Sequence, residues 1–316
     1  MRHLLLAALL ITGLFKSALA LDNNSQISQI GADHTAAVTQ EAVSYGSNLS
    51  QVDQIGTHQN AFVEQSIYQA QNEAVTSQSG EGNDAQTRQR SGMDAANSSS
   101  IEQSGFGNQA RVDQGGFDGG ANVSSIMQDG TANHASVNQD GNLGGSRSAI
   151  VVVGGQNQTK VEQGASHAGN NADLTVIGNG NQVDATQFAS RLLRNVATTD
   201  MAGDDNQFTL KQSGEFGRNH SAINAAGFSN QLDVLQMNGG VDFALNQSTI
   251  RLDGDDNVID VGQGTASSHG VFSQSTHSQI DIDGSSNSIE VRQSGDAASS
   301  SVVSTTGSGN TISVTQ

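Results

Sequence analysis

Apolar and polar residues alternate with a period of two along most of the chain, and this alternation recurs in twelve similar blocks. In each block a short segment containing Gly separates two alternating stretches. A period of two is typical of β-strands that bury one face. The pattern therefore predicts an all-β chain of strand-turn-strand units.

The twelve units align on one residue of each, which we number offset 0. Steps between units are mostly 24 or 25 residues, and the last three are 27, 30 and 23 residues. A regular repeat of this length indicates stacked rungs in a solenoid rather than a conventional domain. Offset 0 falls at residues 29, 54, 78, 103, 128, 152, 176, 201, 225, 252, 282 and 305.

The segment between the two strands of a unit has a fixed composition. Offset +2 is Gly in all twelve units, and offset +5 is Asn in ten, with His34 and Gln59 as the exceptions. Gly and Asn both tolerate positive φ, so we interpret these offsets as a tight turn. The clearest examples of this turn are Gly80 with Asn83, Gly105 with Asn108, and Gly130 with Asn133.

The distribution of charge indicates which face is buried. Offsets −6, −4, −2, 0, +7, +9 and +11 comprise 84 positions, and none of them is Asp, Glu, Lys or Arg, although 14% of the chain is charged. An unpaired charge is costly to bury. These seven columns are therefore expected to face inward, with the charged residues between them facing water.

Folding at the turn places offset 0 opposite +7, −2 opposite +9, and −4 opposite +11. Amide side chains stacked about 4.8 Å apart both donate and accept hydrogen bonds along the stack. The sequence thus predicts two glutamine ladders. At +11 the ladder is Gln40, Gln65, Gln89, Gln114, Gln139, Gln163, Gln187, Gln212, Gln236, Gln263, Gln293 and Gln316; at offset 0 it is Gln29, Gln54, Gln78, Gln103 and Gln128.

Core composition changes along the chain. In the first five units Gln at offset 0 faces Ala at +7, whereas from Val152 onward both offsets become mainly aliphatic. Paired changes of this kind keep the shared volume filled. We therefore expect one solenoid over residues 21–316, with a Gln/Ala-type core in 23–139 and a more aliphatic core in 146–316.

Residues 1–20 have the pattern of a secretory signal peptide. A basic start and an apolar run are followed by Ala18, Leu19 and Ala20, so we predict cleavage after Ala20. The apolar run is too short to span a membrane. Removing Arg2 and Lys16 leaves 11 basic against 31 acidic residues, a net charge of −20.

Composition excludes several functions. A strongly acidic chain repels nucleic acids and anionic membranes, and a chain without Cys has no disulfides. The acidic stretch 252–260 lacks Gly at the position where an EF-hand calcium loop requires it. No nucleophile elbow is present. A polysaccharide-acting β-helix enzyme would need an aligned carboxylate or basic cluster. We expect no catalytic site, no metal and no cofactor.

The motif Gln-x-Gly-x-x-Asn-x-Ala-x-x-x-Gln resembles the repeat of the curlin family, the subunits of curli. It is complete in residues 78–89, 103–114 and 128–139, and has two substitutions in 152–163. The resemblance spans nearly all of residues 23–316. It implies a secreted structural subunit of an extracellular amyloid fibre that assembles head to tail on the Gram-negative cell surface, after crossing the periplasm, for biofilm matrix and adhesion.

The resemblance also implies the partners: further copies of the same chain, a nucleator subunit and curli-type secretion machinery. Two alternatives stay open, a minor or nucleating subunit and a monomeric adhesin that displays loops such as 264–275. A monomeric solenoid needs caps, and neither end of the repeat shows one. The expected assembly ends are Ile27, Val38 and Gln40 at one end and Val303, Val314 and Gln316 at the other.

Overall fold

The computed structural model describes residues 10–11, 21–191, 193–215, 218–238, 245–265, 275–294 and 298–316. These residues form strands and connecting turns, and none lies in a helix, so no membrane-spanning helix occurs in them. The all-β prediction is confirmed. Of the predicted signal peptide, the structure describes Leu10–Ile11, a two-residue strand β1.

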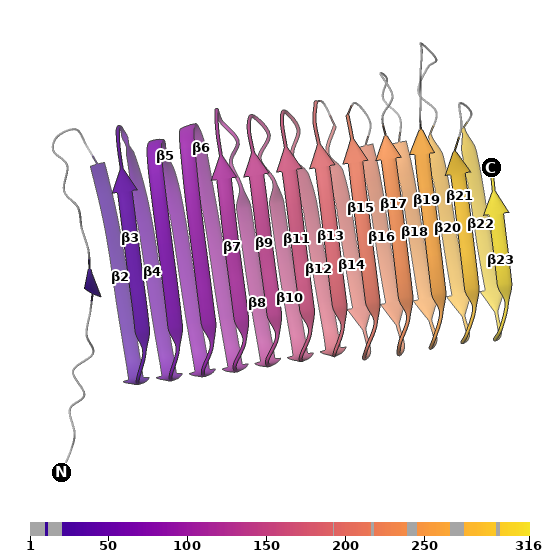
Figure 1. The fold of residues 1–316 in the computed structure, drawn as a ribbon, viewed down its shortest axis with the longest axis horizontal. Coiled ribbons are helices and arrows are strands. Elements are labelled where there is room, and N and C mark those ends of the chain that lie inside the picture. Colours follow the sequence, from indigo (N-terminus) through magenta and orange to yellow (C-terminus); the bar gives the residue numbers. More distant parts are fainter. Residues whose placement is uncertain are drawn as a thin grey trace.

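Two parallel sheets face each other along the length of the molecule, one in front of the other, and form a β-solenoid (Figure 1). The chain passes from the first sheet to the second at each turn and returns at the following link. We call each such circuit a rung. Twelve rungs related by eleven steps are present, in agreement with the sequence repeat.

The first sheet contains the strand before the turn of each rung. Its members are β2 Leu21–Ala32, β4 Gly46–Thr57, the second half of β5 Asn60–Glu81, the second half of β6 Asp84–Phe106, β8 Val123–Thr131, β10 Arg147–Gly155, β12 Asn170–Asn179, β14 Asn195–Ala202, β16 Arg218–Ala226, β18 Leu245–Asp253, β20 Thr276–Asp283 and β22 Ser299–Thr306.

The second sheet contains the strand after the turn. Its members are β3 Thr35–Ala42, the first halves of β5 and β6, β7 Gln109–Gly116, β9 His134–Gly141, β11 Gln158–Ala165, β13 Gln182–Ala189, β15 Gln207–Gly214, β17 Gln231–Asn238, β19 Val258–Thr265, β21 Ser288–Ser294 and β23 Thr311–Thr315.

Strand register follows the repeat, so equal offsets lie next to each other in successive rungs. Gln103 pairs with Gln128, for example, and Gln114 pairs with Gln139. Strands β5 and β6 differ from the expected pattern because they continue through the links. The link 66–71 stays extended and buries Ile67 and Ala70, and its pairing with β6 has one irregularity between Gln69 and Gln71.

Left-handed backbone occurs at two offsets of the turn. Every Gly at +2 has φ between +106° and +143°, and the residue at +4 has φ between +54° and +74° in every rung, as in Ala132 at +54°. Asn at +5 is not among the positive-φ residues. The interpretation of Asn as a left-handed turn residue was therefore wrong; a different role for it is described below.

The apolar core lies between the sheets and falls into two clusters. One is formed in the first three rungs, from Ala36 to Ala74, and the other extends from Ala85 to Val303. Between them, offsets −2 and +9 of the third rung are both Thr, at Thr76 and Thr87, and both are buried. The core thus divides at rung three, earlier than the change from Gln/Ala to aliphatic pairs.

Candidate assembly site: amide ladders and open strand edges

The glutamines at +11 form one continuous ladder across all twelve rungs. Each Nε2 donates to the Oε1 of the next rung, over 2.7–3.0 Å in all eleven steps. The ten ladder glutamines between the first and the last, Gln40 and Gln316, are at most 2% exposed. A buried amide with both groups paired stabilises the stack, at about 1 kcal/mol net for each bond.

The second N–H of each +11 glutamine fixes the direction of the ladder. It donates to the backbone carbonyl at offset −5 of its own rung, as from Gln89 to Glu73 at 2.8 Å and from Gln316 to Ser300 at 3.0 Å. A flipped amide would place its oxygen against that carbonyl. The donors therefore all point toward the C-terminal end of the stack.

The offset 0 ladder is shorter and ends where the core changes. Gln29, Gln54, Gln78, Gln103 and Gln128 are joined by four bonds of 2.7–2.9 Å. Gln128 pairs in register with Val152, which is fully buried and cannot accept a hydrogen bond. Close packing replaces amide pairing from that rung onward.

Two asparagine ladders at the corners were not anticipated. At +5, Nδ2 of one rung donates to Oδ1 of the preceding rung, from Asn133 to Asn108 at 3.1 Å through to Asn310 with Asn287 at 2.9 Å. At −6, pairs such as Asn219 with Asn195 do the same at 3.0 Å. The signal was present in the sequence, because uncharged Asn recurs at both offsets.

Two units have a residue other than Asn at offset +5, and these residues bond to backbone carbonyls instead of to the asparagine ladder. Gln59 takes the place of Asn and donates to the carbonyls of Ile55 at 2.7 Å and Gly80 at 3.0 Å. His34 bonds to the carbonyl of Ile30 within its own rung.

In the acidic stretch 252–260, Asn257 is a buried member of the ladder. No group of His, Asp or Glu able to hold a metal occurs in the described residues.

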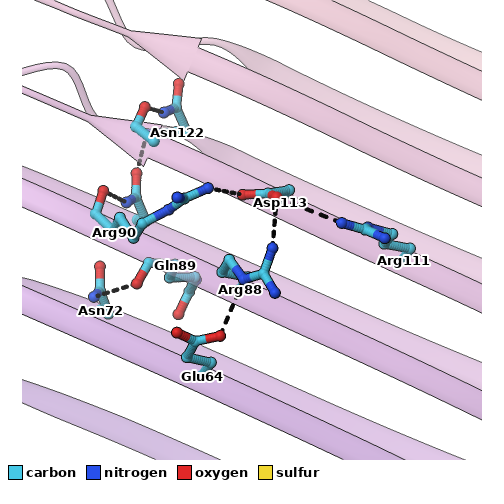
Figure 2. A network of polar contacts seen from close by, with 10 residues as sticks. Glu64, Asn72, Arg88, Gln89, Arg90, Arg111, Asp113 and Asn122 are labelled. Carbon is cyan, nitrogen blue, oxygen red and sulfur yellow. Dashed lines mark hydrogen bonds and ion pairs between the residues drawn. The ribbon is translucent and has the colours of Figure 1, made fainter. Parts of the chain in front are cut away.

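One group of charged residues on the outer face pairs along the stack with alternating sign. Arg88 lies between Glu64, at 3.0 Å, and Asp113, at 3.5 Å, and Asp113 also contacts Arg90 and Arg111 (Figure 2). The hydrogen bond and charge of Glu64 raise the pKa of Arg88 above its usual value. These half-exposed pairs contribute little to stability and relieve repulsion between neighbouring rungs.

Strand edges remain at both ends of the stack. Within the described residues, β22 and β23 pair on one side, with β20 and β21. At the other end β2 pairs with β4, and β3 pairs with β5 and, at Ala37 and Val38, with β1. Rows of unpaired N–H and C=O groups at such edges are templates for another chain.

The two ends carry the predicted assembly residues. Ile27, Val38 and Gln40 lie in the first rung, and Val303, Val314 and Gln316 lie in the last, each at the inward offset of its strand. Ile27 and Val314 are partly buried hydrophobic residues that pack against the core. Both ends thus present the same columns, with their apolar and amide groups in the same order.

A comparison with protein families places a known repeat at one of these ends. Residues 284–316 match the family model of the curlin-associated repeat. The chain contains a curlin repeat. The match confirms the resemblance to the curlin family and covers β21, β22 and β23, from the turn of rung eleven through rung twelve.

The curlin repeat and the solenoid together support a curlin-like structural subunit, and the curlin-repeat family is structural rather than enzymatic. No curated protein matches the chain. Each rung supplies one glutamine to the +11 ladder, so the function is to be sought in the stacking of rungs rather than in a localised cluster of side chains.

One prediction follows from the offset 0 ladder. Gln103→Val should lower the free energy of unfolding by about 2–4 kcal/mol, because Gln78 loses an acceptor and Gln128 loses a donor in a buried column. Adding Ala110→Val should recover part of this loss by filling volume. Denaturant unfolding measures both. The matched control is Gln109→Val at an exposed position, and an equal loss there would contradict the ladder.

Proposed function

We propose that this protein is a secreted structural subunit that polymerises end to end into an extracellular amyloid fibre of a biofilm matrix. The observation that carries the proposal is the continuous +11 ladder. Its internal geometry uses one N–H of Gln316 within the rung and directs the other along the stack. The Oε1 of Gln40 in a second copy is the complementary acceptor.

Other columns also continue across such a joint. In a head-to-tail contact Ser301 meets Ser25, Val303 meets Ile27, and Val314 meets Val38 in the second copy. The pair Thr305 and Ile312 would meet Gln29 and Ala36, which is a mismatch in both polarity and volume. The joint is therefore expected to form and to be weaker than the contacts between rungs of one chain.

The signal peptide predicted from the sequence supports the same function. The predicted signal peptide would direct the chain through the periplasm, and its removal would take away β1, which pairs with Ala37 and Val38 of β3. The edge of β3 would then be free for a second copy. A nucleator subunit and curli-type secretion machinery are the further partners that we propose.

Electron microscopy and fibre diffraction of the chain without residues 1–20 test the proposal. We expect unbranched fibres with a reflection near 4.7–4.8 Å along the axis. A chain that keeps its β-structure but stays monomeric for days at high concentration would sink the proposal and favour the monomeric adhesin. Of that adhesin's loop 264–275, residues 266–274 lie outside the described residues.

Assembly should also depend on pH and salt. The sequence pI is about 4.5, so copies that carry a net charge of −20 after cleavage repel one another at neutral pH. Lowering the pH toward the pI reduces the net negative charge, and added salt screens it, so both should shorten the lag of fibre growth followed by light scattering. Growth rates that do not respond to either change would exclude net charge as the barrier.

A further inference from the structure

The corner that joins the second sheet back to the first contains a groove of about 620 Å³ between rungs six and nine. Gly144, Gly145 and Gly169 are among its lining residues, and Leu193, Arg194 and Arg218 also line it. At these glycines successive links pack backbone against backbone, since a Cβ on Gly169 would stand 2.0 Å from the carbonyl oxygen of Gly145. No carboxylate lines the groove in the described part of the chain.

The two arginines lie directly above one another. Strand β14 pairs with β16 from Val196 with His220 onward, and Asn219 bonds to Asn195, so Arg194 and Arg218 occupy the same column. Their spacing is that of neighbouring strands, about 4.8 Å. Both are exposed, and neither has an ion pair among the described residues, whereas Glu215 pairs with the neighbouring Arg191 at 3.7 Å.

This arrangement differs from that of other paired charges on the outer face. Arg88 stands between Glu64 and Asp113, and Arg292 contacts Asp260 of the rung before it. Stacked arginines without a carboxylate repel each other, in a chain that has 31 acidic residues available. Burial and the charge of Arg218 lower the pKa of the nearby His220.

We propose that this groove binds a linear carboxylated polysaccharide along the stack. A guanidinium presents a planar fork of donors that fits a carboxylate at two points. Arginines in consecutive rungs fit carboxylates on successive units of a polymer. Leu193 and Val196 supply apolar contact for the C–H face of a sugar ring, and the glycines allow close approach.

Other polyanions fit less well. Nucleic acid carries a denser line of negative charge than one carboxylate for each sugar unit, so the net charge of −18 repels it more strongly. The acidic turns of a second copy have Asp204 and Asp205 in rung eight and Asp255 and Asp256 in rung ten, but Phe228 and Ser229 in the rung between them. That edge lacks carboxylates in consecutive rungs. Elsewhere a second copy does have them, at Asp253 with Asp283 and at Asp233 with Asp260, and the test below separates this case from a polysaccharide.

The test is fluorescence anisotropy with labelled tetragalacturonate and the full chain. Arg194→Gln with Arg218→Gln should weaken binding at least tenfold, and labelled maltotetraose, which is neutral, should not bind. The control, Lys211→Gln with Arg251→Gln, removes the same charge elsewhere and should change the affinity less than twofold. All of the replaced residues are exposed, and an unchanged circular dichroism spectrum verifies the fold.

Several results would overturn the proposal. Undiminished binding by the groove variant would remove the groove as the site, and an equal loss in the control would show a general charge effect. Tighter binding of single-stranded DNA of equal charge, lost in the same groove variant, would assign the site to phosphate. If the groove variant lost fibre bundling but still bound galacturonate, the groove would be assigned to contact with a second copy. Because binding is measured on single chains, its failure is distinct from a failure to form fibres.

Discussion

Replacing Gly130 with Ala should disrupt the solenoid locally and produce the largest loss of stability of any single substitution considered. Gly130 has φ +129°, and an added Cβ would stand 1.9 Å from the carbonyl oxygen of Gly154 in the next rung. Residues 130 and 154 both belong to tightly paired backbone, so neither can move away without a large cost in free energy. We expect a loss of at least about 3 kcal/mol, from left-handed strain and from steric overlap.

Gly107→Ala is the matched control. Gly107 also has positive φ, +66°, but a Cβ there meets nothing within 4 Å. The equivalent position in the next rung is already Ala132, at φ +54°. This variant should lose no more than about 1–2 kcal/mol.

Denaturant unfolding of both glycine variants, with hydrogen exchange at rungs four to six, measures the difference. Rungs interact with their neighbours, so disruption should be local and should be seen first as faster exchange around Gly130 and Gly154. Equal unfolding curves for the two variants would contradict the close approach of successive turns.

The double variant Gln40→Glu with Val38→Asp should stop fibre growth at the rung-one end. Gln40 would lose the uncharged amide that continues the ladder, and an Asp at position 38 of the added chain would place a carboxylate against the apolar Val314 of the copy at the seed end. We expect elongation from wild-type seeds to fall at least tenfold. Seeded growth followed by amyloid-dye fluorescence measures it.

Ala37→Asp with Thr39→Glu adds the same two charges to the same strand but on its outward face, and should elongate at close to the wild-type rate. Circular dichroism and unfolding of the soluble chain establish whether the remaining rungs of both variants are folded. If the inward variant adds to seeds as fast as the outward one, rung one is not the docking surface.

Much of the architecture could be predicted because the repeat samples each position twelve times. A single Gln such as Gln114 carries almost no information, but a column of twelve, with charge excluded from the neighbouring inward columns, identifies the buried face. The split of the apolar core at Thr76 and Thr87 was not predicted. The facing offsets −2 and +9 are both Thr in this rung, and only the structure shows that this divides the apolar core into two clusters.

The corners were predicted less well for a different reason. Gly at +2 was correctly assigned to the turn, but the positive-φ residue at +4 varies among Gly, Asp, Ala, Ser, His and Gln, so composition does not identify it. Asn at +5 has two physical uses, a left-handed turn or a buried amide, and the sequence alone does not distinguish them. Asn157 is fully buried and bonded to both neighbouring rungs, and it shows that the second use applies.

The opposed directions of the ladders have an electrical consequence for a long polymer. In the +11 ladder the amide oxygens point toward the N-terminal end, whereas in the +5 ladder they point toward the C-terminal end. Their dipoles therefore largely cancel, and strands themselves contribute little because strand dipoles alternate. A fibre of many such subunits would accumulate no large voltage along its axis, so adding the thousandth subunit should meet the same field as adding the tenth.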